Sequence, residues 1–264
     1  MTSATLKVVQ YEVSNLARSR WLVAYAAFFL LVTDALLRFG GSAPGTLLGL
    51  VNVVLLVVPL VAVTFGTMYL YDAREFTELL LAQPVSRRDL FRGLYVGLAL
   101  PLALAFVVGV SVPLLLHGAI DASLGRTLAT LLVVGVALTA IFTALAFLIA
   151  VRSEDKVRGL GIGVAAWLLC AVVYDGLVLL LVAILADYPL ERPLLFAMLA
   201  NPVDLARVVL LLQFDVSALM GYTGAVFKHF FGSAGGMATA SAVLLLWAAV
   251  PIWLGGRAFR RKDF

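Results

Sequence analysis

The sequence predicts an all-α membrane protein that crosses the bilayer six times, with both ends of the chain on the cytoplasmic side. Hydrophobic residues make up 63% of the 264 residues and charged residues only 13%, whereas soluble domains carry about 25% charged residues. Several apolar runs approach or exceed the ~20 residues that a helix needs to cross the hydrocarbon core. Basic residues are concentrated in alternate segments between these runs, as is typical of polytopic membrane proteins.

Six apolar runs are predicted to span the membrane: residues 21–37, 46–70, 94–116, 127–151, 160–186 and 237–256. They are expected to be helices, because a helix satisfies its own backbone hydrogen bonds in lipid. The pairs Gly93/Gly97 and Gly159/Gly163 have a spacing that lets helices approach closely. No polar region is large enough to form a soluble domain, so residues 1–264 are expected to form one transmembrane domain. No small-residue cleavage site follows the first run, so no cleavable signal peptide is expected.

The distribution of lysine and arginine predicts how the spans are oriented. Fourteen of the 19 basic residues lie before the first span, between spans two and three, between spans four and five, or after span six. The positive-inside rule places these segments in the cytoplasm. We therefore expect an N-in/C-in protein of the cytoplasmic (inner) membrane. The net charge of +4 follows from this distribution, and no nucleic-acid partner is expected.

Residues 4–20 are predicted to form an amphipathic helix ahead of the first span. Apolar residues recur on one helical face: Leu6, Val9, Val13 and Leu16. Such a helix lies in the membrane interface with its cations near the lipid head groups. The alternative is a simple leader into the first span.

The first cytoplasmic loop, residues 72–92, carries signals for ordered structure. Three apolar residues have helical spacing: Phe76, Leu79 and Leu80. Pro84 disfavours helix at the residue before it, and Ser86 then has an N-cap position with Asp89 three residues later. The loop is therefore predicted to form a helix, a break and a second helix, which suits docking in the groove of a partner. The alternative is a solvated loop that only supplies charges for topology.

The second cytoplasmic loop, residues 152–158, is short and densely charged. Its centre holds Glu154, Asp155 and Lys156. Two interpretations of this loop stay open, namely a second contact for the same partner and a tight solvated turn between two spans.

The longest external segment is predicted over residues 187–236. Asn201, Pro202 and Asp204 supply an N-cap, a proline at the first helical position and an acid in the first turn. They predict a helix to about Gln213 with one apolar side, formed by Leu205, Val208, Val209 and Leu212. Because the apolar stretches here are too short to span, we expect external helices that dip into the outer leaflet. They would cap a pathway or receive an external partner.

The fifth span carries one charged residue, Asp175, which lies near its middle and directly after Tyr174, whereas Asp34 stands near the end of the first span. A charge at this depth costs roughly 2.5–3.5 kcal/mol on insertion scales. The Asp175 side chain is therefore expected to face other helices or water rather than lipid, and both its ionised and its protonated form are compatible with such a position. Asp175 is either a functional site or an interhelical anchor that bonds to a residue such as Asn52 or Thr139.

Several other kinds of chemical site are not supported. Cys170 is the single cysteine, which excludes an internal disulfide and a multi-thiolate metal cluster. His117 and His229 are far apart in sequence, so no metal site is expected. Ser233, which stands near His229 between two glycines, has neither a base on another span nor an oxyanion site. The phosphate-binding motif G-x-x-x-x-G-K-S/T does not occur, so this chain does not bind ATP in the P-loop manner.

The loop after the second span resembles the corresponding loop of ABC-2 type ABC-transporter permeases. The resemblance is an acidic start, a threonine before a hydrophobic stretch, and a P-x-S-R motif. The residues that carry it are Arg74, Glu75, Thr77, Glu78, Leu79, Leu80, Leu81, Pro84, Ser86, Arg87 and Arg88. Six spans, an interfacial N-terminal helix and a long external segment before the last span match the same family over essentially the whole chain. Phe76 departs from the pattern, because glycine is usual there in the family.

The resemblance implies a permease subunit rather than an enzyme. In the family this loop forms the coupling helix, which inserts into a separate ATPase subunit that binds ATP and magnesium. The permease chain itself then needs no cofactor. Two copies are expected to pair in the lipid bilayer, and the coupling helices transmit closure of the ATPase dimer to the spans.

Three short motifs are similar to one branch of the family, whose transporter matures the copper centre of nitrous oxide reductase. They are Ser153–Lys156, Tyr174–Asp175 and Leu199–Asp204. This similarity implies a periplasmic partner on residues 187–236. It also implies a cargo for copper-site assembly, either a sulfur species or copper-related material.

Two other functions stay open from the residues alone. Asp175 suits an ion-coupled secondary transporter, in which Pro59 and Pro101 would interrupt spans, although no internal repeat accompanies them. Asp175 also suits an intramembrane enzyme, which requires a second carboxylate or histidine at similar depth that the predicted spans do not contain.

Overall fold

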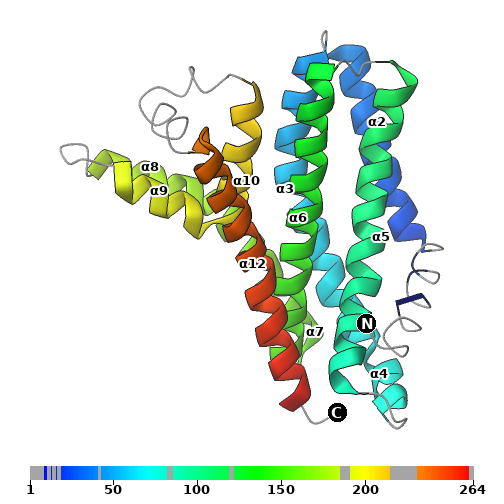
Figure 1. The fold of residues 1–264 in the computed structure, drawn as a ribbon. Coiled ribbons are helices and arrows are strands. Elements are labelled where there is room, and N and C mark those ends of the chain that lie inside the picture. Colours follow the sequence, from blue (N-terminus) through cyan, green and yellow to red (C-terminus); the bar gives the residue numbers. More distant parts are fainter. Residues whose placement is uncertain are drawn as a thin grey trace.

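The computed structural model describes residues 9–10, 13, 16, 19–40, 43–81, 86–118, 122–184, 191–214 and 231–261. All secondary structure in these residues is helical. Six of the described helical segments are long and apolar enough to cross a membrane (Figure 1): α2 (Arg20–Phe39), α3 (Ala43–Asp72), α5 (Arg87–Leu116), α6 (Ala122–Arg152), the continuous path of α7 (Lys156–Leu168), η1 (Leu169–Val173) and α8 (Tyr174–Ile184), and α12 (Ala234–Arg261). The all-α fold class and the six spans are thereby confirmed, whereas the N-in/C-in orientation stays a prediction.

Four shorter elements complete the described structure: α4 (Arg74–Leu81), α9 (Glu191–Ala200), α10 (Pro202–Leu211) and the 3₁₀ turn η2 (Leu212–Phe214). Of the interfacial helix predicted over residues 4–20, Val9, Gln10, Val13 and Leu16 are described and helical. Val9 is buried and Leu16 packs against the core. The other residues between positions 4 and 18 of that predicted helix lie outside the described residues.

Three spans form the centre of the molecule. In their most apolar stretches, 56% of α3, 50% of α5 and 56% of α6 is buried, against 17% for α2 and for α12. The span made by α7, η1 and α8 is only 6% buried. The fifth span is therefore the most peripheral of the six, although α7 still packs on α3 and α6.

Small residues let the central helices approach one another. A side chain at Gly109 on α5 would place its Cβ 2.8 Å from Cβ of Phe29 on α2, so glycine admits Phe29 to the core. Phe29 meets Phe106 edge to face at 5.1 Å between ring centres, and Phe106 fills the space over Gly135 on α6. One aromatic pair thus joins three helices through two positions that have no side chain.

The second cytoplasmic helix predicted for the first loop is not a separate element. The helix that begins at Arg87 continues without interruption to Leu116 and so includes the third span. The reason is local, because the stretch after the Ser86 N-cap contains no residue that ends a helix before Pro101, and α5 continues through that proline. The break predicted around Pro84 falls on residues 82–85, which lie outside the described residues.

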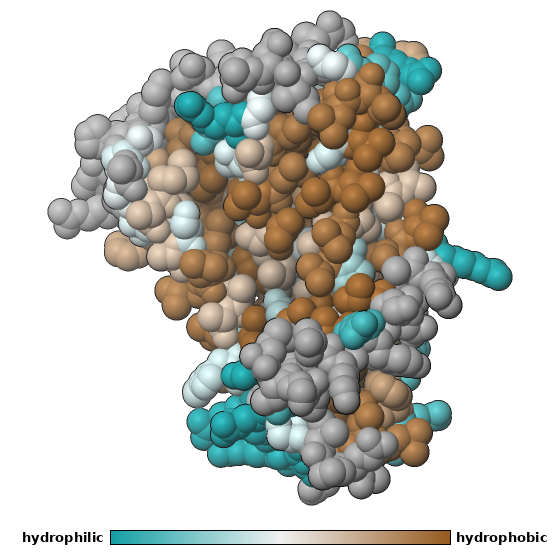
Figure 2. Space-filling view, turned by 45° about the vertical axis from the view of Figure 1, so that its right-hand side comes forward, coloured by the Kyte–Doolittle hydropathy of each residue, from teal (hydrophilic) through white to brown (hydrophobic). Residues whose placement is uncertain are grey.

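The surface agrees with a membrane-embedded bundle. Figure 2 shows brown, hydrophobic side chains across the middle of one face, with the teal, hydrophilic ones gathered mainly toward its two ends. Leucine and valine on the outer sides of several spans are more than a third exposed. In water such a belt would be far larger than the apolar patches of soluble proteins, whereas lipid covers it without cost.

The external segment forms a sharply bent pair of helices. In Figure 1, α8 and α9 extend sideways from the bundle, whereas α10 returns to it. The helices Pro193–Ala200 and Pro202–Leu211 meet at 109°. The sequence predicted one apolar side for α10, but eight of its ten residues are buried. α10 is therefore packed among α3, α6, α12 and η1 rather than lying on a surface.

Candidate functional site

The predicted coupling region contains α4, which follows almost directly on α3. The Ala73 N–H donates to Tyr69 O and the Thr77 N–H donates to Ala73 O, both at 2.9 Å. The Arg74 guanidinium lies over the ring of Tyr71, 5.1 Å from its centre. The chain thus enters α4 without losing helical hydrogen bonds, and α4 is attached to the end of the second span.

α4 presents different residues to the two sides. Thr77 is buried, with 1% of its surface exposed, and Leu80 packs against the core. The residues exposed to the outside are Glu75, Glu78 and Leu79. Leu79 is 70% exposed, although it is a leucine at a polar end of the molecule, one residue after Glu78 and one helical turn after Glu75. The outward face therefore has the composition of a small docking surface, an apolar centre with charges beside it.

The Ser86 N-cap predicted at the start of the third span is present, and Asp89 bonds to its side chain. Oγ of Ser86 accepts a hydrogen bond from the Asp89 N–H at 3.1 Å, and the Ser86 hydroxyl donates to Asp89 Oδ2 at 2.8 Å. Arg88 is exposed, whereas Arg87 is half-buried and donates from Nη1 to Arg260 O on α12 at 3.1 Å. Pro84 lies outside the described residues. The cap fixes where α5 begins, and Arg87 attaches this start to the last span.

The second cytoplasmic loop is bonded to the end of α3. The Tyr71 hydroxyl donates to Ser153 O at 3.0 Å, and Lys156 forms an ion pair with Asp72. Both residues on α3 stand immediately before α4. The two loops that the sequence treated as separate contacts are thus one connected surface, joined through residues 71 and 72.

α7 starts at this surface and packs closely on α3. Asp155 caps it by accepting bonds from two backbone N–H groups of its first turn, at 3.1 and 3.2 Å. A side chain at Gly159 would meet the ring of Tyr71 within 2.9 Å, and one at Gly163 would lie 3.2 Å from α3. The close approach that the glycine spacing predicted is confirmed for this pair. Glu154 is exposed beside the cap.

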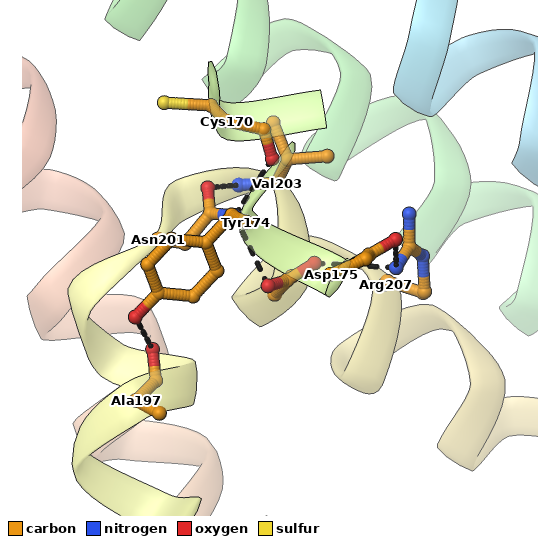
Figure 3. Close-up of polar contacts among 8 residues, drawn as sticks. Cys170, Tyr174, Asp175, Ala197, Asn201, Val203 and Arg207 are labelled. Carbon is orange, nitrogen blue, oxygen red and sulfur yellow. Dashed lines mark hydrogen bonds and ion pairs between the residues drawn. The ribbon is translucent and has the colours of Figure 1, made fainter. Parts of the chain in front are cut away.

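A charged cluster joins the fifth span to α10. Arg207 donates from Nη1 to Asp175 Oδ2 at 2.6 Å and to Asp204 Oδ1 at 3.2 Å (Figure 3). The Asp204 side chain is 2% exposed, whereas those of Arg207 and Asp175 are 30% and 38% exposed. Each carboxyl group is thus paired with Arg207, as a charge at membrane depth requires, although the single positive charge of the guanidinium balances only one negative charge.

Asn201 connects this cluster to the backbone. Its Nδ2 donates to Cys170 O at 2.7 Å and to Asp204 Oδ2 at 3.0 Å, while its Oδ1 accepts from the Val203 N–H at 3.1 Å. Asn201 is therefore the predicted N-cap of α10 and also a bridge to η1. Pro202, in the first turn as predicted, is buried beside it.

The π-helical turn η1 sets the direction in which Asp175 points. Within it the Tyr174 N–H bonds to Leu169 O, five residues back, so the turn contains one residue more than an α-helix allows. All later residues are rotated about the helix axis as a result. The Tyr174 hydroxyl then reaches Ala197 O on α9 at 2.8 Å, and Asp175 turns toward Arg207 (Figure 3).

Arg207 is the residue that the sequence analysis missed. By charge distribution alone Arg207 is one of the five basic residues outside the predicted cytoplasmic segments, and an anchor to a residue such as Asn52 or Thr139 is one of the two interpretations of Asp175. Asn52 is exposed on α3, and the Thr139 hydroxyl donates to its own helix at Gly135 O. The spacing of Asp204 and Arg207, three residues apart on a predicted helix, was an available signal for a shared site.

The described residues contain no group of three or more metal-binding side chains. His117 is held locally, with Nδ1 2.9 Å from Pro113 O and Nε2 3.5 Å from Asp34. Ser233 accepts from the Gly236 N–H at 3.0 Å near the start of α12. His229 lies outside the described residues. The second carboxylate that an intramembrane enzyme requires is brought to Asp175 by α10, but Arg207 engages both acids.

Comparison with known proteins is consistent with this architecture. Residues 6–264 match the model of the ABC-2 family transporter proteins. The chain is 28% identical over 280 residues to the probable ABC transporter permease protein NosY of Pseudomonas aeruginosa, with 97% of each chain covered. It is 26% identical over 270 residues to the protein of the same name from Stutzerimonas stutzeri, covering 94% of this chain and 92% of the relative.

Proposed function

This chain belongs to the ABC-2 family of transporter proteins, and from that premise we propose that it couples ATP hydrolysis in a separate ATPase subunit to export or to cofactor-maturation transport. As a permease similar to NosY along nearly its whole length, it is a multi-pass transport subunit rather than an enzyme. The observation that carries the proposal is α4, a helix attached to the second span whose outward face exposes Leu79 beside Glu75 and Glu78.

The ATPase docks on the outward face of α4. An exposed leucine beside Glu75 and Glu78 fits a groove that is apolar at its centre and basic at its rim. Thr77 and Leu80 face the bundle, so they hold α4 in place rather than touch the partner. Arg74 over Tyr71 adds a second attachment on the inner side. ATP and magnesium belong to the ATPase, and the permease supplies the contact surface.

Motion of α4 is transmitted to three spans. α3 is continuous with α4 through the hydrogen bonds around Ala73, and α5 begins at the Ser86 cap on the other side of the loop. α7 is joined through the Tyr71 bond and the ion pair of Lys156 with Asp72. Glu154 and Asp155 extend the same surface and form the second contact with the ATPase. A displacement at the docking site is therefore applied to α3, α5 and α7 together.

A second copy of the chain covers the fifth span. Its most apolar stretch is only 6% buried, and exposed leucines and valines run along α7, η1 and α8. Lipid alone would solvate these residues, but Asp175 in the same span is 38% exposed. Placing a carboxylate against lipid costs a free energy of several times RT, whereas contact with a partner copy, or with an aqueous space between two copies, removes that cost. Pairing of two permeases along this span follows.

The transported material is proposed from the resemblance of three motifs, Ser153–Lys156, Tyr174–Asp175 and Leu199–Asp204, to one branch of the family. This resemblance implies a sulfur species or copper-related material for the copper site of nitrous oxide reductase, handled at the cytoplasmic (inner) membrane, and the similarity to two NosY permeases supports the branch. The bent helices α9 and α10 then offer the surface for a periplasmic partner. Asn201, Pro202 and Asp204 shape this segment from inside, because all three are buried.

Co-purification with the coexpressed ATPase tests the docking surface. Glu78→Arg and Leu79→Asp place an unfavourable charge on the outward face, and each is expected to weaken association on the order of tenfold or more, as for a residue at the centre of an interface. Thr77→Val is the matched control, since it changes a buried residue of similar shape in the same helix and should leave association unchanged. Wild-type association in both charge variants would refute the assignment of α4.

A further inference from the structure

A hollow of about 540 Å³ lies where α5 begins and α12 ends, at the end of the bundle predicted to face the cytoplasm. It contains four arginines, two from each helix: Arg88, Arg92, Arg257 and Arg260. Trp253 and Ile252 continue its wall along α12 toward the middle of the membrane. This hollow is separate from α4 and from the Asp175 cluster, and the proposed function makes no use of it.

The wall of the hollow is fixed by packing. Phe91 of α5 lies against Gly255 and Gly256 of α12, where an added Cβ would stand 3.1 and 3.5 Å from its ring. Phe91 also meets Phe259 at 5.4 Å between ring centres, and Arg87 bonds to Arg260 O. The two glycines let α12 approach α5 closely, so the four guanidiniums are brought together on a rigid frame rather than on loops.

Within the described residues, the charges of this hollow are not balanced by acidic side chains. Among the described residues, no carboxylate forms an ion pair with Arg88, Arg92, Arg257 or Arg260. Arg257 is placed over the Trp253 ring, 5.7 Å from its centre, which orders one guanidinium without neutralising it. Four like charges at one hollow repel one another, and an anion there would relieve the repulsion through charge-assisted hydrogen bonds.

The apolar part of the hollow identifies the class of anion. Trp253 is 61% exposed and stands between the arginines and the apolar surface of Ile252. Tryptophan is enriched at the level of lipid head groups, and basic pockets between spans bind anionic head groups. Free phosphate or an acidic protein segment would use the arginines but leave the apolar wall uncovered. An amphiphile with an anionic head group uses both parts.

We propose that this hollow binds an anionic phospholipid of the cytoplasmic leaflet, with its phosphate on the four arginines and an acyl chain along Trp253 and Ile252. The bound lipid bridges α5 and α12. The topological role of the same arginines requires only that they be on the cytoplasmic side. It does not require that residues 165 to 172 positions apart in the sequence meet at one hollow beside a tryptophan.

The test uses the full-length protein purified in a non-ionic detergent. Phosphatidylglycerol and phosphatidylcholine with the same acyl chains are added in parallel, and lipid retention is measured by native mass spectrometry and thermal stability. The wild type is expected to retain phosphatidylglycerol preferentially and to gain thermal stability from it. Arg88→Gln combined with Arg257→Gln should reduce this preference on the order of tenfold, because each arginine near an anionic lipid contributes a few-fold.

Arg20→Gln combined with Arg158→Gln is the matched control. It removes two exposed cations from the same predicted end of the molecule but none from the hollow, and it should keep the wild-type preference. An equal loss in this control would show a general charge effect and overturn the proposal, as would no preference in the wild type. One more measurement needs only the wild type. If its preference for phosphatidylglycerol is lost when the ATPase is bound, the four arginines contact that subunit rather than a lipid, and the proposal is overturned.

Discussion

Substitutions in the Asp175 cluster test whether burial or distance decides the strength of its two ion pairs. Arg207 is 2.6 Å from Asp175 but 3.2 Å from Asp204, so distance alone makes the first pair stronger. The Asp204 side chain is 2% exposed, whereas that of Asp175 is 38% exposed. Because a bare carboxylate against lipid is costly, the open edge of Asp175 meets water or a polar surface, and its pair with Arg207 is screened.

The magnitudes follow from this difference. A hydrogen bond to a buried charged group contributes about 2 kcal/mol, and a pair more than a third exposed contributes about 1 kcal/mol or less. Arg207→Gln is therefore expected to lower the free energy of unfolding by about 3 kcal/mol, since both acids lose their cation. In double-mutant cycles the coupling of Arg207 with Asp204 should be about 2 kcal/mol, and that with Asp175 about 1 kcal/mol.

The assay is reversible unfolding in mixed micelles, followed for the wild type and for variants with Asp175→Asn, Asp204→Asn and Arg207→Gln, alone and in pairs. Asparagine keeps the shape of aspartate, so the cycles isolate the charge. A coupling with Asp175 equal to or larger than that with Asp204 would refute the reasoning. It would mean that the exposed edge of Asp175 is covered by a medium as poor in water as the interior.

Two further substitutions test the helix contacts at the predicted cytoplasmic end. Gly159→Ala should destabilise the protein by about 1–3 kcal/mol, because the added methyl group displaces the Tyr71 ring from its bond to Ser153 O. Gly161→Ala is the control on the same helix, with open space around it, and it should be neutral or stabilise the protein by up to about 1 kcal/mol. Thermal unfolding of both variants compares them. Ser86→Ala removes the cap of α5 and should cost about 1 kcal/mol, with faster amide hydrogen exchange confined to the first turn; unchanged exchange there would show that the cap contributes nothing.

Much of the fold follows from patterns that act locally. The apolar runs fix six spans because lipid demands long satisfied helices, and Ser86 and Asn201 fix two helix starts through hydrogen bonds to the next few residues. α4 was predicted from the spacing of three apolar residues, and it forms over Arg74–Leu81. Each of these predictions needs only the residues within a few positions of the feature.

The parts that the sequence did not predict depend on tertiary contacts. The π turn η1 has no residue signature in Leu169–Val173, which is plain apolar helix by composition. Its presence decides that Asp175 faces α10 and meets Arg207, a residue that charge counting had placed outside the membrane region. The nearly complete burial of α10 likewise exceeds what its apolar side predicts, because the 109° bend turns it back among the spans.

The fifth span connects the two candidate sites along one path. At one end it begins at Lys156, which is paired with Asp72 beside α4, and it packs on Tyr71 through Gly159. At the other end it continues through η1 to Asp175 and the charged cluster. The same span has the smallest buried share of the six, and between its two ends it is held to α3 by the packing of α7 and by the bond from Trp167 Nε1 to Leu56 O at 3.0 Å. A displacement of α3 at α4 is therefore passed to α7, which is bonded to and packed on α3, and η1, where the helical hydrogen-bond register changes, is the place where we expect that displacement to turn into bending.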